Sequence, residues 1–293
     1  MPTNIFIVGC GYVGQSVVRY FLDREMPVWA LTRGNAALLQ QLGIQTVMGD
    51  LDKPETLKNL PIQRDTLVFY FAPPPNQGVT DPRLPNFLGA LTQLPEKLIL
   101  ISTTGVYGDC QGAWITEDQP LNPQADRAKR RVDAENTLKN SALNWTILRV
   151  AGIYGAGKLP IERLQKGVPV LAEDQSPFSN RIYLEDLVTV CGVAAEKAAA
   201  RTIYHLSDGN PTTMTDYFNQ VADALKLPRP PEIRANTAKD QLSPEMRSYL
   251  AESKRLNIQK ARSELGFNPQ FPHLTTGLAH LLSHHQLVTQ NGE

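Results

Sequence analysis

The stretch NIFIVGCGYVG (residues 4–14) decides the fold of this chain. Residues 4–8 form a short, mostly apolar run rich in β-branched and aromatic side chains, which predicts a buried strand. A glycine-rich turn follows at once, and residues 15–22 then carry apolar side chains at helical spacing. A Gly-x-Gly-x-x-Gly turn between a strand and a helix is typical of a site for the diphosphate of a dinucleotide.

Each glycine has its own task in such a turn. Gly9 permits the tight turn, Gly11 lets the backbone approach a diphosphate, and Gly14 lets the helix lie close to the strand. The free N–H groups at the helix start, around Tyr12 and Val13, then face the phosphates. A chance glycine turn is the alternative, and the flanking strand and helix favour the dinucleotide site.

Composition narrows the function classes. The chain has 293 residues and no net charge, so a general affinity for nucleic acid or anionic membranes is not indicated. It has no apolar run of about twenty residues and no signal-peptide pattern. Cys10, Cys110 and Cys191 are too far apart for a disulfide framework, and the histidines lack metal-ligand spacing. We therefore expect a cytoplasmic protein without a metal.

Strands and helices alternate along the first half of the chain. Further strands are predicted at 27–31, 44–48, 65–71, 97–101 and 145–150, and helices at 36–42, from Lys53 onwards and at 86–94. This alternation predicts parallel βαβ units in a Rossmann-type, doubly wound α/β sheet. Ligands of such sheets bind beyond the carboxyl ends of the strands. At the other end of the chain, we expect residues 286–293 to be disordered.

The loops after the next three strands complete a candidate cofactor cleft. The second strand leads into Arg33, and no carboxylate is present there to bind a ribose 2′-hydroxyl, so we predict NADP(H) over NAD(H). A solvated loop arginine is the alternative. Asp50 and Leu51 follow the third strand, where the adenine edge would lie, and Ala72 and Pro73 follow the fourth. The prolines of that last loop could equally form a stiff surface turn.

Several motifs in order make the chain resemble the extended short-chain dehydrogenase/reductases, the NAD-dependent epimerase/dehydratase family. These are GCGYVG from Gly9, STTGVYG from Ser102, RVAGIYGAG from Arg149, FSNRIYLEDL from Phe178, and a C-terminal SKRLNIQKARSELGF from Ser253. The resemblance covers nearly the whole chain. It implies hydride transfer with a nicotinamide, assisted by a Ser or Thr, a Tyr and a Lys.

The resemblance places the hydroxyl at Thr103, with Thr104 beside it, although these hydroxyls could simply stabilise the turn. Dehydratases of the family have Asp and Glu after this hydroxyl, so the Thr104-Gly105 pair disfavours elimination of water. Counting back from Glu135, the Lys position is Arg131 and the Tyr position is Arg127. Arg131 could still hold the ribose, whereas a guanidinium cannot replace a phenol as proton donor.

Other residues are candidates for binding the substrate. Two arginines facing the cleft would suit an anionic substrate, and a solvated basic helix face is the alternative. Tyr107 and Tyr154 lie in strand-end loops near the expected cleft. By resemblance Arg181 lies near a substrate diphosphate, but a structural arginine paired with Glu185 or Asp186 would explain it equally well.

We expect residues 1–157 to form the dinucleotide-binding domain, with 179–207 returning to it, and residues 158–293 to form a smaller substrate-binding lobe. Two functions remain open at this point. One is an NADP-dependent oxidoreductase or epimerase on a small sugar-like or anionic substrate, acting as a homodimer if it follows the family. The other is a non-catalytic redox sensor that binds NADP(H) and reports to a partner.

Overall fold

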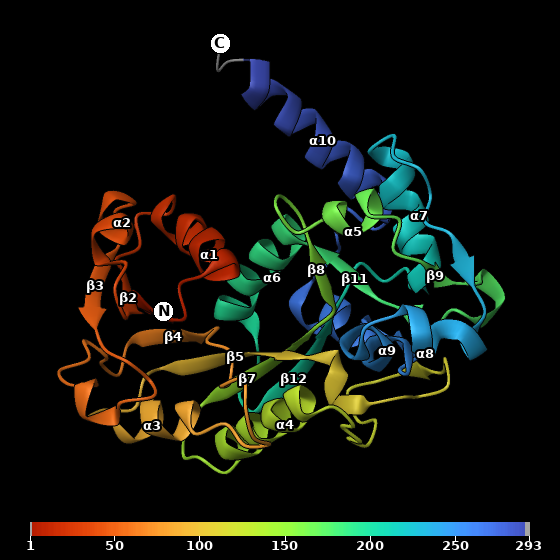
Figure 1. The fold of residues 1–293 in the computed structure, drawn as a ribbon. Coiled ribbons are helices and arrows are strands. Elements are labelled where there is room, and N and C mark those ends of the chain that lie inside the picture. Colours follow the sequence, from red (N-terminus) through yellow and green to blue (C-terminus); the bar gives the residue numbers. More distant parts are fainter. Residues whose placement is uncertain (1, 291–293) are drawn as a thin grey trace.

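The centre of the fold is a seven-stranded parallel sheet with the order β12-β7-β5-β4-β1-β2-β3 (Figure 1). The computed structural model describes the backbone of residues 2–290 and the side chains of residues 2–284. The strands are β1 (Asn4–Val8), β2 (Val28–Thr32), β3 (Gln45–Met48), β4 (Thr66–Tyr70), β5 (Lys97–Thr103), β7 (Trp145–Val150) and β12 (Thr202–Leu206). The predicted Rossmann-type, doubly wound α/β fold is confirmed.

Helices cover both faces of this sheet. Helix α1 (Tyr12–Leu22) packs beside α6 (Leu184–Lys197) on one face, while α3 (Arg83–Gly89) and α4 (Asp126–Lys139) lie on the other (Figure 1). Helix α1 places Val17, Val18 and Phe21 on one buried stripe, as its apolar spacing requires. The short α2 (Ala36–Gln41) lies against β3. Because both faces are covered, the central strands are buried along almost their whole length.

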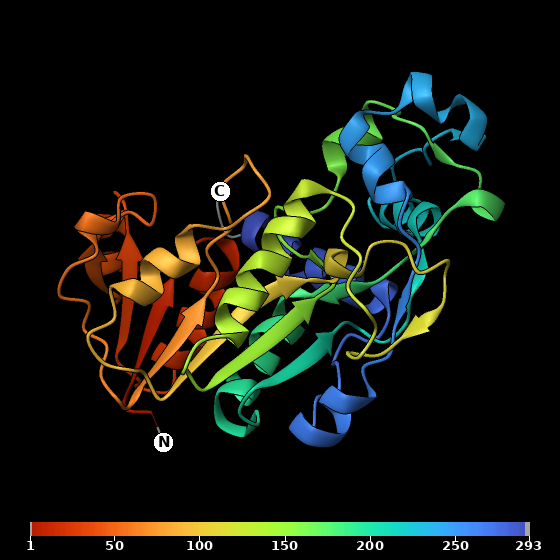
Figure 2. The same ribbon diagram turned by 90° about the horizontal axis from the view of Figure 1, so that it is seen from below.

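A second, smaller group of elements lies at one end of the sheet (Figure 2). It includes the paired strands β8 (Gly152–Tyr154) with β11 (Arg181–Tyr183), β9 (Val170–Leu171) with β14 (Glu232–Ile233), and β10 (Phe178–Ser179) with β13 (Thr212–Thr213). Its helices are α5 (Ile161–Gln165), α7 (Met214–Ala224), α8 (Ala238–Gln241), α9 (Pro244–Leu250) and α10 (Leu274–Gln290). Tyr154, Phe218 and Leu278 belong to its separate apolar core.

The C-terminal third of the chain contributes to both parts. Strand β12 is an edge strand of the main sheet, and helix α6 packs on that sheet. The short π-helical segment Ala261–Leu265 packs on the same core against α6. Strand β15 (Arg255–Leu256) pairs with β6 (Trp114–Ile115), which lies in the loop after β5. The chain therefore crosses between the two parts at least once more than the predicted division, 1–157 with 179–207 returning, implies, and that division stays a prediction.

Two local expectations differ from the structure, and a third lies at the edge of the described residues. Helix α3 begins at Arg83, because the Asp81 carboxylate accepts a hydrogen bond from the Arg83 backbone N–H at 2.9 Å, and it ends at Gly89. The helix expected from Lys53 is only a short 3₁₀ turn, Pro54–Thr56. Helix α10 runs to Gln290, but the side chains of residues 285–290 and the whole of residues 291–293 lie outside the described part, so the disorder predicted for residues 286–293 stays a prediction.

Within the described residues, no helix is both long and apolar enough to span a membrane. The same part of the chain contains no group of three His, Cys, Asp or Glu side chains arranged to hold a metal ion.

Candidate functional site

Two cavities meet at the carboxyl ends of the central strands. The first has a volume of about 780 Å³ and lies in front of α1, between the loops that follow β1, β2, β3 and β4. The second, of about 460 Å³, lies between the loop after β5, helix α4 and the smaller lobe. Pro73 lines both cavities, so a long ligand in the first can reach the second.

The glycine loop shapes the floor of the first cavity. Gly9 has a φ of +90°, and a Cβ there would lie 2.4 Å from the backbone nitrogen of Ala72. A Cβ on Gly14 would lie 2.7 Å from the Gly9 carbonyl oxygen. By contrast, a Cβ on Gly11 would meet no protein atom within 4 Å. Gly9 and Gly14 thus allow the chain to fold, and Gly11 leaves open space beside the helix.

The N-terminus of α1 fits a diphosphate. No side chain caps this helix, so its first N–H groups, from Tyr12 onwards, have no side-chain acceptor. Tyr12, Val13 and Gly14 all line the first cavity. Free N–H groups and the positive end of the helix dipole are the usual donors to phosphate oxygens. The residues present therefore fit the phosphate part of a dinucleotide.

The loop after β2 presents a cation at the far end of this cavity. Arg33 is exposed, and the Thr32 hydroxyl oxygen holds the loop by accepting from the backbone N–H of Asn35 at 3.1 Å. The Asp50 carboxylate accepts from the Asp52 N–H at 3.1 Å and is thereby fixed beside the cavity. All the sequence-predicted cofactor residues except two line this cavity: Gly9, Gly11, Tyr12, Val13, Gly14, Arg33, Asp50, Leu51, Ala72 and Pro73. The two others, Thr103 and Arg131, line the second cavity.

Arg83 and Lys158 also line the first cavity, and no motif or spacing pattern in the sequence pointed to either. Arg83 forms an ion pair with Asp52 at 2.6 Å and donates to the Pro73 carbonyl at 2.8 Å, which ties two cofactor-side loops together. The hydrogen bond from Arg83 lowers the pKa of Asp52. The Lys158 ammonium comes from the loop after β8 and lies 4.9 Å from the centre of the Tyr12 ring. Both contacts join segments far apart in sequence, and the spacing of residues along the chain predicts contacts only between near neighbours.

Besides Pro73, the second cavity brings together five of the predicted site residues: Thr103, Thr104, Arg127, Arg131 and Arg181. The Thr103 hydroxyl oxygen accepts weakly from the Gly105 N–H at 3.3 Å, so it also supports the turn. Arg131 donates to the carbonyls of Ala72 and Ile101 at 3.4 and 3.3 Å. Burial lowers the pKa of Arg131.

Arg127 and Arg181 reach this cavity from opposite sides. Arg127 donates to the Ser248 hydroxyl at 3.0 Å and stacks 4.1 Å from the centre of the Tyr249 ring. Arg181, on β11, stacks 3.9 Å from the centre of the Tyr217 ring, and its pKa is lowered by burial.

The alternative explanation of Arg181, an ion pair with Glu185 or Asp186, is wrong. The Asp186 carboxylate instead accepts from the backbone N–H groups of Gln270 and Phe271, at 2.7 and 3.0 Å. Glu185 lies 3.8 Å from His280. Among the described residues, Arg181 has no ion-pair partner within 4.0 Å.

The placement of Tyr107 and Tyr154 at the cleft needs correction, because neither lines either cavity. Tyr107 is 1% exposed, and its hydroxyl contacts Arg149 and His205. Tyr154 is fully buried under α10, where a Cβ on Gly277 would collide with its hydroxyl. Burial raises the pKa of both phenols. Their loops lie near the cleft, but the side chains point into the core.

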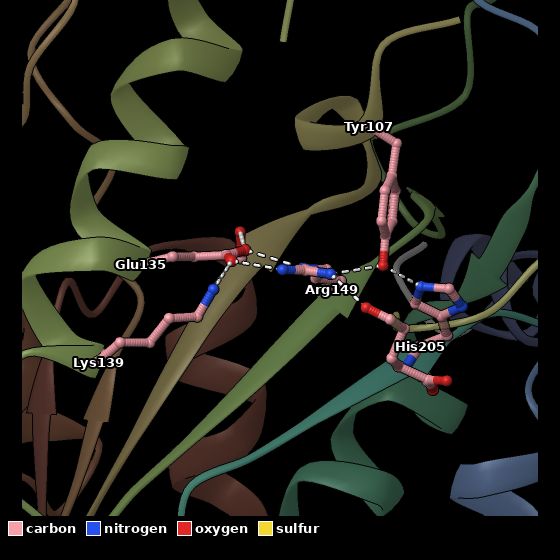
Figure 3. Close-up of polar contacts among 7 residues, drawn as sticks. Tyr107, Glu135, Lys139, Arg149 and His205 are labelled. Carbon is pink, nitrogen blue, oxygen red and sulfur yellow. Dashed lines mark hydrogen bonds and ion pairs between the residues drawn. The ribbon is translucent and has the colours of Figure 1, made fainter. Parts of the chain in front are cut away.

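A buried polar network anchors the base of α4 (Figure 3). Glu135 forms an ion pair with Arg149 at 2.7 Å and accepts from the Ser102 hydroxyl at 2.7 Å. Arg149 in turn donates to the Tyr107 hydroxyl at 2.6 Å. Burial opposes ionisation of Glu135, but these donors hold its pKa below the ordinary value. The network fixes Arg131, one turn earlier on α4, relative to the end of β5.

The comparisons with known proteins agree with this geometry. A family model described as NAD(P)H-binding matches residues 9–178. Protein YeeZ of Escherichia coli K12 is 27% identical over 184 residues, which cover 62% of this chain and 61% of that protein. The match thus spans about three fifths of the length of this curated relative.

Two solved structures share the fold. A functionally unknown conserved protein from Silicibacter pomeroyi superimposes with a TM-score of 0.82 at 25% identity, covering 96% of this chain and 99% of that one. UDP-glucose 4-epimerase from Thermotoga maritima, solved with UDP-glucose, has a TM-score of 0.75 at 19% identity, covering 98% of this chain and 99% of that one. Because the family model spans more than half of the sequence and includes the glycine loop, the chain belongs to the NAD(P)H-binding family, with the fold of the NAD-dependent epimerases and dehydratases.

Proposed function

We propose that this protein is an NADP(H)-dependent oxidoreductase or epimerase that acts on a small sugar-like or anionic substrate. The observation that carries this proposal is the second cavity, which adjoins the dinucleotide cleft at Pro73 and contains Thr103 and Arg131. A bound nicotinamide supplies or accepts a hydride there. Thr103 orients the reacting oxygen of the substrate, and Arg131 holds the nicotinamide ribose by charge and hydrogen bonds.

The preference for NADP(H) rests on Arg33. It is an exposed cation at the end of β2, lines the cofactor cleft, and has no ion-pair partner within 4.0 Å among the described residues. A guanidinium offers paired N–H donors that match a phosphate group. No carboxylate stands at the end of β2 to bind a 2′-hydroxyl in the manner of NAD sites.

The proton donor of the proposed reaction is not the usual phenol. Helix α4 has arginines at the positions where the resembling family has Tyr and Lys, and Arg127 and Arg131 both line the second cavity. Loss of positioned acid–base catalysis lowers rates by roughly 10² to 10⁴. Glu252 and Lys254, an ion pair at 2.7 Å, line this cavity together with the phenol of Tyr249, and these three side chains are our candidates for proton exchange.

The redox sensor is the second candidate. A sensor needs a dinucleotide cleft and no substrate cavity, whereas this chain has a cavity of about 460 Å³ beside the cleft, with Glu252 and Lys254 in its wall. That cavity favours the enzyme. The likeness in fold to an epimerase solved with UDP-glucose supports a sugar-like substrate.

The test uses nucleotide sugars and anionic carbonyl compounds as substrates, with NADPH absorbance to follow net reduction and NMR of the products to follow epimerisation, which consumes no net cofactor. We expect Thr103→Val to lower kcat/KM by roughly tenfold or more, and Thr104→Val to serve as the matched neighbour with a smaller effect. Equal rates for wild type and Thr103→Val would remove Thr103 from the reaction. Tight but unequal binding of NADPH and NADP, with neither reduction nor epimerisation of any substrate, would favour the sensor.

A further inference from the structure

The second cavity has an unusual charge. Its wall includes four arginines, Arg127, Arg130, Arg131 and Arg181, together with Lys254. The carboxylate in that wall, Glu252, is already paired with Lys254 at 2.7 Å. Among the described residues, none of the four arginines has a carboxylate within 4.0 Å. The wall of the cavity therefore carries a large uncompensated positive charge.

These arginines are held in place rather than left free in solvent. Arg130 is only 7% exposed and donates to the Gly78 carbonyl. Arg131 is held by backbone carbonyls, and Arg127 and Arg181 each stack on a tyrosine ring. The buried Nε atoms of Arg130 and Arg181 have no acceptor among the described residues. Uncompensated buried charge is costly, so such a cluster is expected where a ligand supplies the opposite charge.

The nearby carboxyl groups do not remove this charge. Asp81 and Glu135 lie near Arg131, and Asp208 lies near Arg181, but none of the three lines the cavity, and Glu135 is already paired with Arg149. Burial raises the pKa of Asp81, and it raises the pKa of Asp208 to about 7, so Asp208 carries less negative charge near neutral pH than an ordinary aspartate.

We infer that the second cavity binds its ligand through an anionic group, a phosphate or a carboxylate, held jointly by the arginines of α4 and by Arg181. This inference deepens the function proposed above, because it names the substrate class of the same cavity. Arginine is suited to the task, since its planar fork donates two parallel hydrogen bonds to either group. The shared chemistry is a fixed anion next to Thr103, at the end of the cavity that adjoins the cofactor cleft.

The test is calorimetric titration with inorganic phosphate and, separately, with malonate, on protein saturated with NADP so that the diphosphate site is occupied. We expect Arg127→Gln and Arg181→Gln to weaken binding of the preferred anion by tenfold or more each. Arg64→Gln, at an exposed arginine outside both cavities, is the matched control and should bind like wild type. Stronger binding of phosphate than of malonate identifies a phosphate subsite, and the reverse a carboxylate subsite.

Two further results separate this inference from the proposed function. Melting curves must show that the arginine variants are folded, and their affinity for NADPH should match wild type. Equal anion affinity in wild type and both folded variants would overturn the inference while leaving the cofactor site intact. If NADP does not bind at all, the same titrations on the free protein still compare wild type with Arg127→Gln and Arg181→Gln.

Discussion

Glu135 and Arg149 form an ion pair that is almost completely removed from solvent, with side-chain exposures of 0% and 2%. Two hydrogen bonds join them, from Arg149 Nη2 to Glu135 Oε2 at 2.7 Å and from Nε to Oε1 at 3.1 Å (Figure 3). The pair connects α4 to β7, and Ser102 adds the end of β5. It therefore determines where α4 presents its arginines to the second cavity.

Glu135→Gln should destabilise the protein by about 3–5 kcal/mol, because it leaves the Arg149 charge buried without a counter-charge. Urea unfolding followed by circular dichroism measures this change. The matched control is Lys139→Met, which removes a partly exposed partner of the same carboxylate and should cost about 1 kcal/mol or less. Similar free energies of unfolding for wild type and Glu135→Gln would show that the pair contributes little.

His205 should make stability fall as the solution becomes acidic. Its pKa is lowered from 6.5 to about 4, chiefly by burial, so between these values the unfolded chain binds a proton that the folded chain does not. Stability is therefore fully present above pH 6.5 and is lost as the pH falls towards 4. At pH 5 the loss amounts to about 2 kcal/mol. His205→Gln should remove this part of the pH dependence in urea unfolding between pH 7 and pH 5.

Asp208 should act in the opposite direction and serves as the comparison for His205. Its pKa is raised from 3.8 to about 7 by burial, so the folded chain holds a proton that the unfolded chain has lost. The group favours folding at low pH, and this advantage disappears as the pH rises through 7. Asp208→Asn should therefore raise stability, relative to wild type, more at pH 8 than at pH 5. The same difference at both pH values would contradict the raised pKa.

Alanine at two glycines of the same loop should have different effects. Gly9→Ala puts a Cβ 2.4 Å from the Ala72 nitrogen at a φ of +90°, so we expect a loss of about 3 kcal/mol or more of stability. Gly11→Ala meets no protein atom within 4 Å and should change stability by about 1 kcal/mol or less. It should nevertheless weaken NADPH binding by roughly tenfold or more, because the Cβ occupies space beside the diphosphate. Unchanged NADPH affinity in Gly11→Ala would place the diphosphate elsewhere.

Lys158 should contribute to binding of the cofactor diphosphate. Its ammonium lies 4.9 Å from the centre of the Tyr12 ring, at the start of α1. Lys158→Gln should weaken NADPH roughly five- to tenfold by calorimetry, since one charge-assisted contact is lost. Adenosine 2′-monophosphate, which lacks the diphosphate, should bind both proteins alike. A matching loss for this smaller ligand would assign Lys158 to the adenosine end instead.

Local patterns predicted the cofactor loop and six of the seven strands of the sheet, whereas β12 was not predicted as a strand and only its segment was expected to return to this domain. The run NIFIV and the three glycines specify a strand, a turn and a helix within a single short stretch, and each predicted cofactor residue except Arg131 follows a predicted strand. The resemblance to a family also picked out Thr103 and Arg131, which the fold brings to one cavity.

Long-range contacts explain what the sequence did not predict. The polar surroundings of the second cavity come from Asn180, Glu252 and Lys254 as well as from α4, and the Asn180 side chain donates to the Lys254 carbonyl at 2.9 Å. No periodicity joins positions so far apart. Tyr107 and Tyr154 were wrongly placed at the cleft for a different reason. The sequence locates their loops, but the direction of each side chain depends on how the core packs.

The most direct test of the proposed NADP(H) site is calorimetric titration of NADPH and NADH into wild type and Arg33→Ala. We predict that wild type binds NADPH at least about tenfold more tightly than NADH, and that Arg33→Ala loses this difference while keeping its affinity for NADH. Equal affinity for both dinucleotides, unchanged by the substitution, would contradict the assignment of Arg33 to a 2′-phosphate.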